Sequence, residues 1–165
     1  LSAIYGMYAG VYHWFPKMYG RMMNKGLGYL HFWGTFICAY GVFFPMHFLG
    51  LAGLPRRYYQ NSSFPMFDGL TDINAVITFF ALAGAVFQFI FIFNFFYSIF
   101  KGTKASKNPW QANTLEWTTP VERIHGNWPG ELPTVHRWAY DYSKPGADKD
   151  FILQTEPLKE GEEEH

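Results

Sequence analysis

The stretch INAVITFFALAGAVFQFIFIFNFFYSIF, at residues 73–100, contains no Asp, Glu, Lys or Arg in its 28 positions. A helix needs about 20 consecutive apolar residues to cross a bilayer core about 30 Å thick. This run exceeds that length, so a helix formed by it can cross with some tilt. Uncharged runs this long are rare in the cores of water-soluble proteins. The stretch therefore predicts a transmembrane helix at residues 72–101.

Two further uncharged runs lie before this one. Residues 26–55 lack Asp, Glu, Lys and Arg over 30 positions, which predicts a second transmembrane helix at residues 26–49. Residues 1–16 are also uncharged, but this run is slightly short for a complete span. We interpret residues 1–15 as the end of a transmembrane helix that begins upstream. Together the three runs predict an all-α membrane protein.

The composition differs between the two parts of the chain. Aromatic residues make up 21% of the sequence, a high content for a small water-soluble domain, and charged residues concentrate after residue 100. The formal net charge is zero and the sequence has no basic stripe, which argues against a nucleic-acid partner. The single cysteine, Cys38, has no second cysteine with which to form an internal disulfide.

Basic residues near the ends of the apolar runs predict the orientation in the membrane, because Lys and Arg are enriched on the cytoplasmic side. Three follow the first run and three follow the third: Lys17, Arg21, Lys25, Lys101, Lys104 and Lys107. The segment between the second and third runs has two, Arg56 and Arg57, together with two acids. We therefore expect residues 16–25 to form a cytoplasmic loop, residues 50–71 an outer loop and residues 102–165 a cytoplasmic tail.

The tail has a different pattern from the apolar runs. Prolines alternate with tryptophans and tyrosines, and no period of 3.6 or 2 persists. This pattern predicts an extended chain rather than long helices. Exposed tryptophan at such density is unusual, so we expect the segment up to Tyr142 to be ordered along the cytoplasmic face of a larger assembly.

The histidines do not have the spacing of a metal site. His31 and His47 lie sixteen positions apart on one predicted helix, which separates them by about 24 Å at 1.5 Å per residue. They cannot bind the same ion. The sequence also lacks a catalytic triad, a phosphate-binding loop and a paired-cysteine site. It therefore predicts no catalytic residue and no metal ligand.

Arg56 and Arg57 form the most informative charged pair. They follow LGLAGLP at residues 49–55, and no acid occurs before Asp68. A guanidinium group favours carboxylates and phosphates, which it binds through two parallel hydrogen bonds. A lipid phosphate could accept these bonds, and so could an anion supplied by a partner outside the segment.

Three segments resemble subunit I of the haem–copper cytochrome c oxidases. HFLGLAGLPRRY at residues 47–58 resembles the loop before the last span of that subunit. YHWFP at residues 12–16 resembles the end of its tenth span. NPWQANTLEWTTP at residues 108–120, followed by HGNWP at residues 125–129, resembles the segment after its twelfth span.

The resemblance implies a fold, a site and an activity. The fold would be the C-terminal part of a twelve-helix transmembrane bundle with an extended cytoplasmic tail. Arg56 and Arg57 would bind the propionates of two haems, expected to be of type a. The ligands of these haems and of the copper would lie upstream of residue 1. The complete enzyme would transfer electrons from cytochrome c to oxygen, form water and pump protons.

The resemblance also implies partners and a location. The partners would be the remainder of subunit I, a copper-bearing subunit, other oxidase subunits, cytochrome c and membrane lipids. We expect the bacterial inner membrane rather than the mitochondrial one.

Two alternatives remain open. One is a quinol-oxidizing member of the same superfamily, although the intact Pro-Arg-Arg-Tyr motif favours cytochrome c. The other is a small, non-catalytic membrane anchor whose arginines bind lipid phosphates. Met46 replaces a glutamine that is common in the family, and the sequence predicts no consequence of this change.

Overall fold

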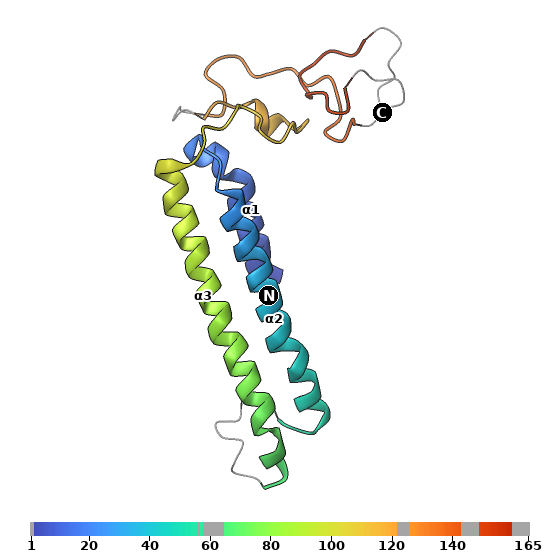
Figure 1. Cartoon of the computed structure of the whole chain (residues 1–165). Helices are drawn as coiled ribbons and strands as arrows, with labels where there is room; N and C mark the ends of the chain where they lie inside the picture. The colour runs from blue at the N-terminus through green and yellow to red at the C-terminus, as the bar shows by residue number, and fades with distance from the viewer. Residues whose placement is uncertain (1, 56, 58–64, 122–125, 143–148, 160–165) are drawn as a thin grey trace. The chain divides into compact units, whose positions relative to one another are not determined.

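A computed structural model describes residues 2–55, 57, 65–121, 126–142 and 149–159. It contains three α-helices: α1 (Ser2–Tyr19), α2 (Lys25–Leu51) and α3 (Thr71–Lys101). Two short 3₁₀ helices are η2 (Pro65–Leu70) and η3 (Leu115–Thr118) (Figure 1). The described residues form two isolated β-bridges and no strand. These observations confirm the prediction of an all-α fold.

The chain divides into two compact units. Residues 24–100 form one, here called the hairpin unit, and residues 1–23 together with residues 101–165 form the other, here called the tail unit. The hairpin unit contains α2, η2 and α3. The tail unit contains α1 and the charged segment that follows α3. Segments far apart in the sequence therefore pack together within the tail unit.

In the hairpin unit, α2 and α3 pack as antiparallel neighbours (Figure 1). The ring of Phe87 lies over Gly34, and a Cβ atom built on Gly34 would be 2.2 Å from that ring. The ring of Phe80 covers Gly41 in the same way, with a Cβ-to-ring distance of 2.5 Å. Small residues allow helix backbones to approach closely in lipid, where packing rather than water exclusion drives association.

Polar side chains fix the register of the two helices. The amide of Asn24 donates to Oδ1 of Asn94 and to Oγ of Ser98, each at 3.2 Å, and Nδ2 of Asn94 donates to the carbonyl of Asn24 at 3.1 Å. Asn94 and Ser98 are completely buried. Farther along, Nε2 of Gln88 donates to Oγ1 of Thr35 at 3.0 Å. These bonds satisfy polar groups that lipid could not.

The outer faces of α2 and α3 are apolar and exposed. Both helices are long and apolar enough to cross a membrane. Large side chains such as Phe89 and Phe100 are 69% and 72% exposed. Water-soluble monomers rarely expose contiguous apolar surface on this scale, whereas lipid solvates it. Both helices are thus candidate membrane spans at the predicted positions: α3 ends at the predicted residue 101, and α2 lies within two residues of its predicted ends.

Helix α1 extends to Tyr19, four residues beyond the predicted limit of 15. The helix continues through Pro16 for three more residues, although proline cannot donate a backbone hydrogen bond. Gly20 then stops the helix in a left-handed conformation with φ of +66°, and its amide donates to the carbonyl of Pro16 at 2.8 Å.

The tail packs against the last turns of α1. Nε1 of Trp110 donates to the carbonyl of His13 at 3.0 Å, and Trp117, which is 2% exposed, makes an edge contact with the His13 ring. Nζ of Lys17 donates to the carbonyl and to Oγ1 of Thr119. Two of the predicted tail tryptophans therefore contact α1 directly.

The later tail is held by hydrogen bonds rather than by helices. The backbone of Gln154 accepts from the amide of His136 and donates to the carbonyl of Asn113, and its side chain accepts from the amide of Leu115. A buried ion pair joins Arg137 and Asp141 at 3.1 Å. The described residues after α3 contain no α-helix, as the alternation of proline and tryptophan predicts.

Candidate functional site

A glycine-dependent turn ends α2 and sets the direction of the chain before the arginines. The amide of Gly53 donates to the carbonyl of Gly50, and the amide of Leu54 donates to the carbonyl of Leu49, both at 3.0 Å. This pair of bonds is a Schellman motif, which places a left-handed residue just after the helix. Gly53 supplies that residue with φ of +87°. Pro55 follows and cannot continue the helix.

An open cavity of about 1030 Å³ lies beside this turn, and we call it the Arg57 cavity. Its lining comes from the last turns of α2, the chain just after them and the first turn of α3. The lining residues are Phe43, Met46, His47, Leu49, Gly50, Leu51, Leu54, Pro55, Arg57 and Asn74. Most of this lining is apolar, so the cavity suits a large apolar body with a small number of polar groups.

Two polar side chains of the Arg57 cavity are oriented by helix carbonyls. Nδ1 of His47 lies 2.9 Å from the carbonyl oxygen of Phe43, which can only accept, so Nδ1 carries the proton of the neutral ring. Nε2 of His47 is then an acceptor. Nδ2 of Asn74 donates to the carbonyl of Leu70 at 3.2 Å.

Arg57 is the charged member of this lining and adopts an unusual backbone conformation. Its φ is +64°, in the left-handed region that side chains other than glycine rarely occupy. Such a conformation costs about 1–2 kcal/mol for an L-residue. The side chain is exposed. A conformation with this cost persists where the surrounding structure or a ligand determines it.

The guanidinium group of Arg57 has no hydrogen bond or ion pair with another residue of the described ranges. Asp68 in η2 and Asp72 in α3 are the nearest acids in sequence, and neither forms an ion pair with it. The positive charge is therefore available to an anion from outside the hairpin unit. Arg56, the other predicted site residue, lies outside the described residues.

The described residues contain no group of three or more His, Cys, Asp and Glu side chains that could hold a metal ion. His31 lies in the first half of α2, and the centroid of its ring is 5.1 Å from that of Phe91. His47 lies near the end of the same helix. This placement agrees with the sequence-based argument that the two histidines cannot share one ion.

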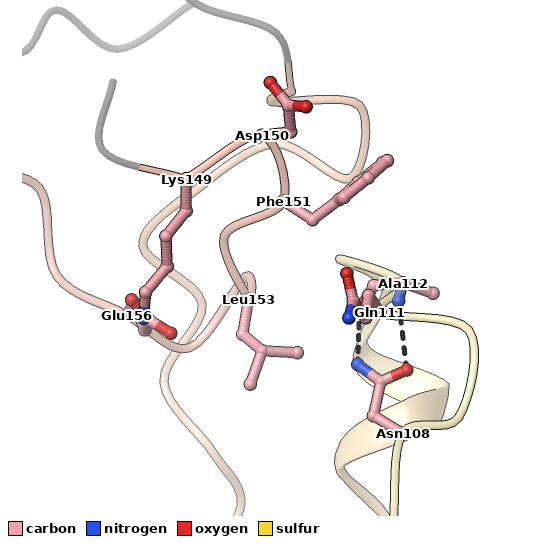
Figure 2. A pocket seen from close by; sticks show the side chains of 8 residues that line it. All are labelled: Asn108, Gln111, Ala112, Lys149, Asp150, Phe151, Leu153 and Glu156. Atoms are coloured by element: carbon pink, nitrogen blue, oxygen red, sulfur yellow. Dashed lines mark hydrogen bonds between the residues drawn. The ribbon is translucent and has the colours of Figure 1, made fainter. Parts of the chain in front are cut away.

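A second hollow, of about 510 Å³, lies in the tail unit (Figure 2). Asn108 closes the turn beside it, because its side chain donates to the carbonyl of Ala112 at 2.8 Å and accepts from the amide of Ala112 at 3.0 Å. Lys149, Asp150 and Glu156 line it as well, and Asp150 points away from the turn. This lining has charges of both signs, so it does not select an anion or a cation.

The first half of the sequence matches a known protein family. Residues 1–83, which include α1, α2 and both arginines, match the model of the family described as cytochrome c and quinol oxidase polypeptide I. The chain belongs to this family. The match ends within α3, so the tail contributes nothing to it.

Curated members of the oxidase family cover most of the chain, tail included. The alternative cytochrome c oxidase subunit 1 of Bradyrhizobium diazoefficiens is 50% identical over 153 residues, which are 92% of this chain and 26% of that protein. The cytochrome c oxidase subunit 1 of Thermostichus vulcanus is 43% identical over 86% of this chain and 24% of that protein. The cytochrome c oxidase subunit 1 of Synechocystis sp. is 43% identical over 96% of this chain and 27% of that protein. The chain thus spans about a quarter of the length of these relatives.

The sequence did not identify Asn74 as part of the site. It lies seventeen positions after Arg57 and joins the Arg57 cavity because α3 begins near the end of α2. A polar residue in the first turn of an otherwise apolar helix is the one available signal, and it does not distinguish a lining residue from an interfacial one.

Proposed function

We propose that the chain is the C-terminal part of the core subunit of a terminal respiratory oxidase. The complete enzyme transfers electrons from cytochrome c to oxygen, forms water and pumps protons. In that enzyme this segment packs beside two haems, and Arg56 and Arg57 hold haem propionates on the outer side of the membrane. Residues 16–25 and the tail face the cytoplasm.

The observation that carries this proposal is the position of Arg57. An uncompensated guanidinium group borders a cavity that is mainly apolar, within a segment that matches the oxidase family. A lipid phosphate explains the charge, but it does not require a large, mainly apolar cavity beside Arg57. An amphipathic cofactor with carboxylates would use both the charge and the apolar lining.

The described residues fit the edge of a haem. The apolar lining suits a macrocycle, and a planar guanidinium group suits a carboxylate through two parallel bonds. The bound haem supplies iron for electron transfer, with iron ligands from other parts of the subunit, and copper likewise binds elsewhere. The arginines of this segment neutralise the propionates and stabilise the reduced haem relative to the oxidized haem, which carries one more positive charge.

Cytochrome c is the proposed electron donor. The family description includes quinol oxidases, but the three curated relatives named above are cytochrome c oxidase subunits 1. The proposed partners are the rest of subunit I, a copper-bearing subunit, further oxidase subunits, cytochrome c and lipids of a bacterial inner membrane.

Haem-resolved redox titration of the purified complex tests the proposal. Arg57→Gln and Arg56→Gln each remove a positive charge, so we expect a lower reduction potential of the haem whose propionate is bound. Lys at either position should restore part of the lost reduction potential. An ammonium group supplies the positive charge, but it cannot form the two parallel hydrogen bonds of a planar guanidinium group.

Lys149→Gln is the control, because it removes one positive charge from an exposed lysine of the tail unit. It should leave both haem potentials unchanged. Haem content and the optical spectrum report whether each variant complex is assembled. Wild-type potentials in fully haem-loaded Arg56→Gln and Arg57→Gln complexes would overturn the propionate assignment and favour lipid phosphates as the bound anions.

A further inference from the structure

A second pair of cations, formed by residues far apart in the sequence, lies in the tail unit. Arg21 and Lys104 face each other in an isolated antiparallel β-bridge. The amide of Met22 donates to the carbonyl of Thr103 at 2.8 Å, and the amide of Ala105 donates to the carbonyl of Gly20 at 2.9 Å. The two bonds flank the pair, and we call this arrangement the basic bridge.

The geometry of the basic bridge brings the two positive side chains close together. Bonds that flank a residue pair on both sides make it a non-hydrogen-bonded pair, in which the Cα atoms are about 4.5 Å apart. Directly opposed side chains of an antiparallel pair also project to the same face. Like charges in these positions destabilise the pairing. An anion bound between the two side chains would offset this repulsion.

The described residues supply no such anion. The ion pairs found in them are His13 with Glu116 and Arg137 with Asp141, and neither includes the basic bridge. The sequence has no Asp or Glu between Asp72 and Glu116, and none before Asp68. Lys101 and Lys107, which flank Lys104, are exposed and add further positive charge.

Arg21 is held in a way that leaves donors for a ligand. Its Nη1 donates to the carbonyl of Gly102 at 2.6 Å, which anchors the guanidinium group against the chain that follows α3. A guanidinium group has five N–H donors, so other donors remain. The side chain of Lys104 has no hydrogen bond or ion pair with another described residue. Its ammonium group adds a compact positive charge opposite the guanidinium group of Arg21.

We propose that the basic bridge binds the phosphate of an anionic phospholipid. Lys101 is the last residue of α3, a helix long and apolar enough to cross the membrane, so the chain just beyond it lies at the level of the lipid headgroups. Basic clusters directly after a span attract anionic headgroups. Met18 and Tyr19, which precede Arg21, are 53% and 39% exposed and offer apolar surface to acyl chains. This site does not depend on haem.

Photo-crosslinking of the wild-type complex tests the site without any substitution. The complex is reconstituted with phosphatidylglycerol that carries a photoactivatable group near the headgroup, and labelled peptides are mapped by mass spectrometry. We expect labels within residues 18–25 and 101–107. The same group on phosphatidylcholine should label these peptides less. Equal labelling by both lipids, or none by phosphatidylglycerol, would overturn the proposal.

Lipid titration of the delipidated complex measures how much Lys104 contributes. Lys104→Gln should weaken phosphatidylglycerol binding about fivefold, as expected for one basic residue at an anionic surface. The same variant should stabilise the lipid-free complex, because it removes the cross-strand repulsion. Lys149→Gln, at an exposed tail lysine beside Asp150, is the control and should change neither quantity.

The remaining outcomes identify other occupants. Inorganic phosphate could also compete with phosphatidylglycerol in the lipid titration. If it did so at a similar concentration, the bridge would be a general anion site rather than a lipid site. Unchanged lipid binding in Lys104→Gln would show that another group, such as a carboxylate of the complex, neutralises the bridge. Either result would overturn the proposal. Neither would bear on the haem assignment, which the redox titration tests separately.

Discussion

The hairpin unit and the tail unit place their polar and apolar groups in opposite ways. In the hairpin unit, large apolar side chains face outward and the interface between α2 and α3 contains glycines and a few buried amides. In the tail unit, a buried ion pair and the hydrogen bonds of Gln154 hold segments that have no α-helix. The apolar outer surface of the hairpin unit suits lipid, whereas the charged segment of the tail unit pairs its buried polar groups within the protein.

The largest expected effect concerns the ion pair of the tail unit. The side chains of Arg137 and Asp141 are 2% and 7% exposed, so Asp141→Ala removes one carboxylate from the surroundings of a buried arginine. Removing one partner of a buried pair costs about 3–5 kcal/mol. Hydrogen exchange in the intact complex should therefore show a lower opening free energy for residues 136–142 and 151–157.

Glu116→Ala provides the comparison within the same unit. Its carboxylate lies 3.7 Å from His13, but the two side chains are 42% and 48% exposed. An exposed pair contributes about 0–1 kcal/mol. Equal effects of the two substitutions would contradict the view that buried polar contacts hold the tail together.

An intermediate effect is expected at the interface of the hairpin unit. Gly34→Ala places a Cβ atom 2.2 Å from the ring of Phe87, so the ring or the helices must move. Overpacking of this kind costs about 1–3 kcal/mol. Exchange should accelerate in the amides of α2 and α3 while the described tail remains unchanged. Gly6→Ala in α1, where a Cβ atom has open space, is the control and should not destabilise its helix.

The smallest effect distinguishes two glycines that are three positions apart. Added Cβ atoms at Gly50 and Gly53 would both meet open space, so sterics do not separate them. Gly53 has φ of +87°, and Gly53→Ala should cost about 1 kcal/mol. Gly50 is helical, and Gly50→Ala should stabilise α2 by about 0.5–1 kcal/mol. Thermal melting of the complex should shift in opposite directions, and shifts of the same sign would contradict the Schellman assignment.

The long helices and part of the candidate site could be predicted from local patterns. An uncharged run of 28 residues has one stable conformation in lipid, because a helix satisfies every backbone group within itself. The turn before the arginines is also local, since its glycine and proline are adjacent in sequence to the helix they end. The end of α1 was less predictable, because proline is usually a signal that a helix ends, whereas α1 continues through Pro16.

The sequence by itself determined the transmembrane helices, the extended tail and the charged motif with Arg57, because each depends on residues close together in the chain. Only the tertiary structure decided that Asn74 lines the Arg57 cavity and that Lys104 opposes Arg21 across 83 positions. Such pairings depend on how α3 returns along α2 and on how the chain after α3 meets the chain after α1. The physical reason is that hydrophobic periodicity specifies which segments become helices, whereas the contacts between segments follow from packing and from hydrogen bonds between distant residues.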